Sequence, residues 1–222
     1  MWATDVVPYF EADSSIRQFS GVIKRGERPS SNASEIADVI HRLEERRPTL
    51  YHELTVLQTW LVENKGSVGD EAAELYRSAS EAMDFLPTDA FLWLVIAYIG
   101  PKHGLSPGGV SACLAFSYEL APNEGWLASM RNPIFLDRAQ DLEPAVQEAL
   151  FFEFVALVRS GLYDAAVTTL QRSSPSARSN LIGRLSELSQ DRKSDFARIL
   201  RERNVDDIRI PGIELSPRRR WE

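Results

Sequence analysis

The stretch PTDAFLWLVIAYIGPKHGLSPGGVSACLAFSYELAP, from Pro87 to Pro122, decides the fold of this chain. It holds two apolar segments, 89–99 and 107–120, each long enough for a helix. The glycines and proline within 100–104 interrupt the helical pattern between them. Ser106–Pro107 is typical of a helix start, because a Ser hydroxyl accepts from unpaired backbone N–H groups and Pro fits the first turn. The stretch therefore predicts two helices that fold back on each other.

Apolar residues at helical spacing continue on both sides of this stretch. Their period indicates helices, and no alternating strand pattern of useful length precedes residue 205. Breaks are expected at 132–133 and 174–176, where Pro follows a polar residue. We expect further helices over 14–24, 35–47, 50–64, 71–86, 124–130, 143–160, 163–173, 181–188 and 194–203. The predicted fold class is therefore all-α.

Composition limits the functions that the chain can perform. Its 222 residues are 44% hydrophobic and 26% charged, which is typical of a globular protein. A net charge of -7 argues against a general nucleic-acid binder, because such a protein needs a basic surface. The sequence contains no run of about 18 apolar residues, which is the length that would predict a membrane-spanning helix. Cys113 is the only cysteine, so the chain alone builds neither a disulfide nor a thiolate metal site.

Two places in the chain resemble the tetratricopeptide repeat (TPR). In this repeat, a large aromatic residue follows the closing proline by six positions, and a small residue follows the aromatic residue by four. Pro87, Trp93 and Ala97 fit this spacing. The turn 161–166 is similar to the G-x-Y-x-x-A turn of the family. The resemblance is best over 51–174. A non-repetitive helical bundle whose paired helices mimic the motif is the alternative.

The resemblance implies antiparallel helix pairs stacked as a short TPR-like superhelix. We expect a single helical-repeat domain over 1–204 and an extended tail over 205–222. In the family, the concave face of the first helices holds a peptide. The matching positions are apolar and lack a carboxylate clamp: Phe91, Leu94, Val95 and Tyr98. Such a set forms either a groove for an amphipathic helix or a buried face, and a helix that is apolar all round favours burial.

The residue pattern does not indicate an enzyme. His41, His52 and His103 share no metal-binding spacing. The Gly-rich segment 106–111 lacks the Lys of a phosphate loop, so a helix cap at its first residue explains it better. Cys113 lies among apolar residues and is expected in the core. We therefore expect no catalytic, cofactor-binding or metal-ligating residues.

The C-terminal segment differs in character from the helical region. Acidic, β-branched and turn residues give way to Arg218, Arg219, Arg220 and Trp221. One interpretation is a strap that lies over the last helices and is held by its apolar residues, Ile208, Ile210, Ile213 and Leu215. The other is a recognition tail whose basic end binds an acidic partner, or anionic lipid if the chain is tethered to a membrane.

A partner surface has to be sought away from the central pair if the apolar face of that pair is buried. We consider the helix pair around 150–170, the surroundings of Trp126 and the basic tail. The candidate partner-binding residues are Trp126, Phe151, Val155, Arg218, Arg219, Arg220 and Trp221.

These patterns favour a non-catalytic protein-interaction or scaffolding module that binds a protein or peptide and no nucleic acid. One alternative is a membrane-anchored accessory protein of a bacterial envelope or polysaccharide system, with an anchor before the partly apolar start at 1–10. The expected location is cytoplasmic for the chain as it stands, and periplasmic or membrane-tethered under this alternative. The other alternative is an enzyme with an unrecognised site in a helical fold.

Overall fold

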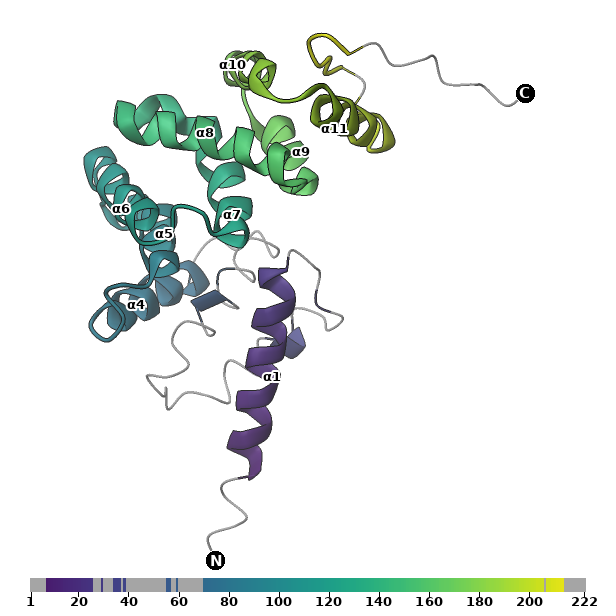
Figure 1. Cartoon of the computed structure of the whole chain (residues 1–222). Helices are drawn as coiled ribbons and strands as arrows, with labels where there is room; N and C mark the ends of the chain where they lie inside the picture. Colours follow the sequence, from purple (N-terminus) through teal and green to yellow (C-terminus); the bar gives the residue numbers. More distant parts are fainter. Residues whose placement is uncertain are drawn as a thin grey trace, which may run out of the picture. The chain divides into compact units, whose positions relative to one another are not determined.

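The computed structural model describes residues 7–25, 29, 34–36, 38, 55–56, 59, 70–205 and 207–213 (Figure 1). These residues are helical or lie in turns and connections, and none of them is in a strand. The all-α prediction is therefore confirmed for this part of the chain. Most of the helices expected over 35–47 and 50–64, with His41 and His52, lies outside the described residues.

The chain divides into two compact units, Met1–Leu127 and Ala128–Glu222. The described helices of unit 1 are α1 (Val7–Lys24), α4 (Asp70–Met83), α5 (Ala90–Ile99), the 3-10 helix η2 (Gly100–His103), α6 (Pro107–Leu120) and the start of α7 (Gly125–Phe135). Those of unit 2 are the rest of α7, η3 (Leu136–Asp141), α8 (Pro144–Ser160), α9 (Tyr163–Arg172), α10 (Pro175–Arg184), η4 (Leu185–Glu187) and α11 (Gln190–Glu202). The single domain expected over 1–204 stays a prediction.

Helix α5 is the core of unit 1. It packs against both α4 and α6, which lie beside it in Figure 1. Seven of its ten residues are buried. Of the four positions that match the ligand-facing set of the TPR, Phe91, Leu94 and Val95 are buried and Tyr98 is partly exposed. The expectation of a buried face is therefore confirmed for three of the four, because an all-round apolar helix removes most surface from water when it lies between two others.

Helices α5 and α6 form an antiparallel pair. Near the end of α6, the Ser117 hydroxyl donates to the carbonyl of Ala90 at the start of α5, at 2.8 Å. At the other end of the pair, Leu105 fills the space beside two glycines. A Cβ atom on Gly100 would lie 2.6 Å from this leucine, and one on Gly109 would lie 2.5 Å from it. The absence of a side chain at both glycines therefore allows the two helix ends to close around Leu105.

The helix starts in this pair follow the sequence signals. Asp89 accepts from the Phe91 N–H at 2.9 Å, and the Ser106 hydroxyl accepts from the Gly109 N–H at 3.1 Å. Pro107 is the first residue of α6, as predicted. Each cap satisfies a donor that the helix itself leaves unpaired, so these boundaries are set locally.

Helix α8 is the centre of unit 2. It contacts η3, α9, α10 and α11, and most of its apolar residues are buried. Its C-terminus ends at Gly161, whose φ of 80° is a left-handed conformation that glycine adopts without strain. The chain then turns into α9, as the G-x-Y-x-x-A resemblance predicts. Phe154 of α8 packs edge-on against Phe196 of α11, with ring centroids 6.4 Å apart.

Two boundaries in unit 2 differ from the prediction. The break expected at Asn132–Pro133 is wrong, because α7 continues through Pro133. Asn132 and Pro133 are buried, and the Asn132 amide donates to a carbonyl of α8, so tertiary contacts outweigh the hydrogen bond that proline removes. Helix α10 starts at Pro175 rather than at 181, because Ser174 caps it and proline occupies its first turn.

The described part of the tail, residues 205 and 207–213, follows α11 without further helix. Val205, Ile208 and Ile210 are buried, and the Gln190 amide of α11 donates to the Gly212 carbonyl at 2.8 Å. The burial of Ile208 and Ile210 agrees with the strap interpretation, whereas Ile213 is partly exposed. Leu215 and the basic end, Arg218 to Trp221, lie outside the described residues.

Candidate functional site

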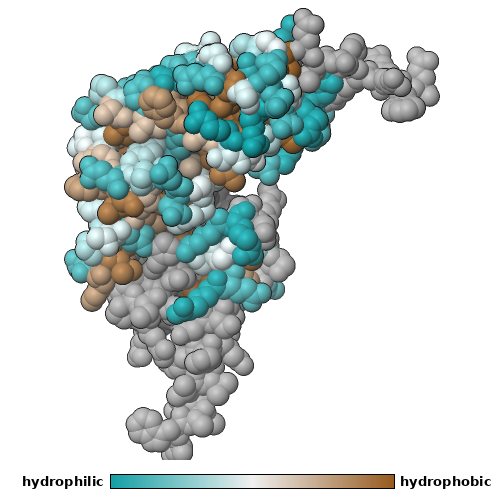
Figure 2. Space-filling model, viewed as in Figure 1, coloured by the Kyte–Doolittle hydropathy of each residue, from teal (hydrophilic) through white to brown (hydrophobic). Residues whose placement is uncertain are grey.

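An exposed cluster on the α5–α6 pair is the strongest candidate for a contact surface in unit 1. Phe116 and Leu120 of α6 are 47% and 40% exposed, and the Trp93 ring of α5 stacks on Phe116 with centroids 4.8 Å apart. We call these three residues the aromatic patch. The Trp93 indole N–H donates to the Pro87 carbonyl at 2.9 Å, which fixes the ring beside Phe116. Figure 2 shows apolar surface among polar residues over α4 to α6.

The sequence held a signal for this patch that motif comparison missed. The buried stripe of α6 runs through Val110, Cys113, Leu114 and Ser117. Phe116 and Leu120 are four positions apart and lie off that stripe. An apolar pair off the buried face of an amphipathic helix indicates exposed apolar surface.

Carboxylates lie in the segments that carry or border the aromatic patch in the sequence. Glu119 precedes Leu120 on α6, and Glu124 follows it in the turn to α7. Asp84 is in the turn after α4, next to Phe85, another exposed aromatic residue. All three acidic residues are exposed. The segments next to the patch in the sequence therefore carry exposed negative charge.

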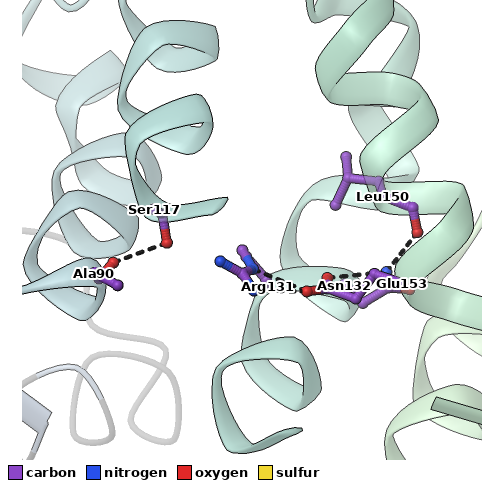
Figure 3. A network of polar contacts seen from close by, with 6 residues as sticks. All are labelled: Ala90, Ser117, Arg131, Asn132, Leu150 and Glu153. Carbon is purple, nitrogen blue, oxygen red and sulfur yellow. Dashed lines mark hydrogen bonds and ion pairs between the residues drawn. The ribbon is translucent and has the colours of Figure 1, made fainter. Parts of the chain in front are cut away.

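A buried polar network is the main concentration of charge inside unit 2 (Figure 3). The Arg131 guanidinium, which is fully buried, contacts Glu153 Oε1 through Nη2 at 2.8 Å and Nε at 3.0 Å. The Asn132 amide nitrogen donates to the Leu150 carbonyl at 2.8 Å and to Glu153 Oε2 at 3.2 Å. Both carboxylate oxygens of Glu153 therefore accept donors, and Asn132 Oδ1 has no hydrogen-bond partner among the described residues.

This network is suited to holding α7 against α8, not to catalysis. Glu153 is buried and both of its carboxylate oxygens already accept donors, so a substrate does not reach it without breaking the network. Sequence reasoning missed it because its members come from two helices and lie about twenty residues apart. The dipeptide Asn132–Pro133 gave a turn signal, which concealed the role of its asparagine.

A second arginine organises the surface of α8 and α10. Arg184 of α10 donates to both oxygens of Glu148, at 2.7 and 2.9 Å. Its guanidinium lies 4.6 Å from the ring centroid of Phe151 and 5.9 Å from that of Phe152. The hydrogen bond from Arg184 lowers the pKa of the Glu148 carboxyl, so this side chain stays charged near neutral pH.

The residues predicted to bind a partner are in different environments. Trp126 is partly buried, tilted against Phe91 at 5.4 Å between centroids, with the Lys24 ammonium 5.3 Å from its ring. Phe151 and Val155 are only 8% and 4% exposed, so they support the surface of α8 but contribute little of it. The neighbouring Phe152 is 61% exposed. Arg218, Arg219, Arg220 and Trp221 lie outside the described residues.

The described residues do not assemble other reactive groups. They hold no cluster of three or more His, Cys, Asp or Glu able to bind a metal ion. Cys113 is buried, and burial raises the pKa of its thiol. The His103 ring stacks on Tyr76 with centroids 4.4 Å apart. None of the described helices combines the length and the hydropathy that crossing a membrane requires.

Comparisons with protein-family models, with curated proteins and with solved structures gave no match for this chain. The proposed function therefore depends on the residues of the chain itself.

Proposed function

We propose that this chain is a non-catalytic protein-interaction module whose contact surface is the aromatic patch. The observation that carries the proposal is the stacked Trp93–Phe116 pair, which stays at the surface beside Leu120. Exposed aromatic residues that are held rigidly lose little side-chain entropy on binding, which is why such residues are enriched in interfaces. A surface of this kind is suited to binding a partner.

The helix pairs α5–α6 and α8–α9 are the TPR-like elements of this module. Two features of the motif support this part of the proposal. Ala97 and Ala166, which match the small residues of the repeat, are both fully buried. Gly161 adopts the left-handed conformation at the turn between α8 and α9. We propose that such pairs are the repeating unit of a short superhelix.

The partner that best fits the patch is an amphipathic helix with basic residues beside its apolar stripe. Phe116 and Leu120 form a ridge along α6, because residues four positions apart share a helix face. A second helix laid along this ridge would place apolar residues at helical spacing on it. The exposed carboxylates Glu119, Glu124 and Asp84 favour Lys or Arg on the flanks of that helix.

Site-specific photo-cross-linking tests this proposal. In cells that produce the full chain, Phe116 is replaced by a photoreactive phenylalanine analogue, and the cross-linked segment of the partner is identified. We expect a segment with an apolar stripe at helical spacing and basic flanks. The same substitution at Leu162, an apolar residue of unit 2 that is 39% exposed, is the control. No adduct specific to position 116 would contradict the proposal.

Affinity measured with the purified partner gives the second readout. The double variant Phe116→Ser/Leu120→Ser should raise Kd by about tenfold or more, equivalent to about 1.4 kcal/mol, because apolar contacts at the centre of an interface dominate binding. Leu162→Ser should leave Kd unchanged. Circular dichroism should show the same helix content in all variants. Unchanged affinity in the double variant would place the contact surface elsewhere.

A further inference from the structure

Helix α8 has a largely exposed face, on which the Arg184 guanidinium of α10 binds Glu148 and lies 5.9 Å from the Phe152 ring centroid. Phe152 is 61% exposed, the highest value of any large apolar side chain in the described part of the chain. Glu148, Ala156 and Arg159 are exposed as well. Exposing a phenylalanine to water to this extent is unfavourable unless another surface covers it.

These four residues form one stripe along α8. A helix turns by about 100° per residue, so positions four apart are offset by about 40° and positions eleven apart by about 20°. Glu148, Phe152, Ala156 and Arg159 therefore lie within a narrow sector of the helix surface. Along the stripe the order is an acidic, a large apolar, a small apolar and a basic residue.

This order is self-complementary when a second copy of α8 runs antiparallel to the first. With the centre of the contact between residues 152 and 156, Phe152 of one copy meets Ala156 of the other, and the small residue leaves room for the ring. The same register places Glu148 of each copy opposite position 160 of the other, one residue from Arg159, and the long Arg159 side chain spans this offset of about 1.5 Å. Because of the two-fold axis, each contact occurs twice in the dimer.

The two charged side chains of the stripe are exposed, and Glu148 is held in place by Arg184. Arg184 holds the Glu148 carboxylate with two hydrogen bonds and lowers its pKa, so the carboxylate is fixed in place and ionised. A carboxylate has about four acceptor positions, so Glu148 can accept a further donor. Arg159 forms no ion pair with any described residue and is exposed, so its guanidinium is available to a second copy.

We propose that the chain self-associates as a two-fold dimer through antiparallel contact of α8, with Phe152 against Ala156 and Glu148 against Arg159 across the axis. The partner at this face is a second copy of the chain. The proposal does not depend on the aromatic patch, which lies in the other unit. One helix pair buries less area than a standard interface, so the dimer is weak, with a Kd on the order of 10 to 100 µM.

Sedimentation equilibrium of the full chain tests the dimer. The wild type should change from monomer to dimer as its concentration rises through this range, and Phe152→Ser should raise Kd by about tenfold or more. Phe116→Ser, which removes an exposed phenylalanine from unit 1, is the matched control and should dimerise as the wild type does. A wild type that stays monomeric at about 1 mM, or a Phe152→Ser variant that dimerises like the wild type, would overturn the proposal.

Charge reversal tests the register and the symmetry. Arg159→Glu places like charges opposite each other twice in its homodimer, and so does Glu148→Arg. Both variants should be monomeric alone. Mixed together, the two variants should form a heterodimer. Glu148 of the first variant then faces Arg159 of the second, and the acidic side chain introduced at position 159 faces the basic one introduced at position 148.

Native mass spectrometry of the mixture, with one variant isotopically labelled, counts the heterodimer directly. Arg172→Glu is the control, since it makes the same charge change at an exposed site in the last turn of α9. It should dimerise as the wild type does. Loss of dimer in Arg172→Glu, or a mixture without heterodimer, would overturn the proposed register.

Discussion

The helix pair α5–α6 and the contact between α7 and α8 are held together by opposite means. The first has an apolar interior, a neutral hydrogen bond from Ser117 to Ala90, and glycines that make room for Leu105. The second has a fully buried arginine paired with a buried glutamate. In the first, the helix starts follow from local sequence features, and the contacts between the helices are apolar or neutral. The second exists only when two distant segments meet, and removing half of it leaves an uncompensated charge.

Breaking the buried ion pair should have the largest effect. Arg131→Met leaves the Glu153 carboxylate buried without its main partner, and we expect the free energy of unfolding of unit 2 to fall by about 3–5 kcal/mol. Urea denaturation followed by circular dichroism measures it. Arg198→Met, which removes an exposed pair with Glu202 on α11, is the control and should change the free energy of unfolding far less.

The double variant Arg131→Met/Glu153→Met sharpens the same comparison. It removes both charges, so its destabilisation should be smaller than the sum of the two single variants. Additive effects would show that the two side chains do not act as a pair.

A methyl group at Gly109 should disturb the α5–α6 pair by overpacking. The new Cβ would lie 2.5 Å from Leu105, so Gly109→Ala should destabilise unit 1 by about 1–3 kcal/mol. Gly108→Ala is the matched control: its nearest atom is 4.0 Å away, and alanine favours a helix over glycine by about 1 kcal/mol. In thermal unfolding, Gly109→Ala should lower the melting temperature and Gly108→Ala should raise it. Changes of the same sign in both variants would contradict the packing of Leu105 against Gly109.

The neutral hydrogen bond between α6 and α5 should matter less. Ser117→Ala removes the donor to the Ala90 carbonyl and should cost about 1 kcal/mol. Hydrogen exchange at the first amides of α5 measures the local effect. Ser106→Ala, which removes the cap of α6, should cost a similar amount but act on the N-terminus of α6 instead. If both variants showed faster exchange at the same amides, the two hydroxyl groups would not act on separate helix starts, which would contradict this prediction.

The smallest effect concerns pH. Because Arg184 lowers the pKa of Glu148, the folded state gains stability above the unfolded pKa of this carboxyl and loses it as the pH falls through the lower folded value. An NMR titration should show the Glu148 pKa below the usual value of 4.5, and Arg184→Gln should raise it. Arg172→Gln should leave it unchanged. A Glu148 pKa that does not respond to Arg184→Gln would show that Arg184 is not the cause of the shift.

Short-range chemistry explains which parts of the fold were predicted. The starts of α5 and α6 were located because Asp89 and Ser106 cap N–H groups only two or three residues away. The end of α8 was located because Gly161 alone of its neighbours suits the left-handed turn. The continuation of α7 through Pro133 was not predicted, since it depends on contact with α8.

The candidate site was less predictable than the fold. Trp93 was identified as the aromatic residue of the repeat, but its exposure depends on where Phe116 lies across the helix pair. Phe151 and Val155 were proposed as surface residues and are buried, whereas Phe152 is exposed. Apolar periodicity shows that a helix has a buried face, but a helix rich in apolar residues all round does not indicate which of them stay outside.

The sequence by itself determined the helical class, the capped starts of α5 and α6 and the glycine turn after α8, because these depend on contacts between residues near in the chain. Only the tertiary structure decided the pairing of Arg131 with Glu153, the closure of two glycines around Leu105 and the surface position of Phe116 and Phe152. These features depend on which helices meet and in what register. Burial and pairing energies are gained only after distant segments come together, so no local pattern specifies them.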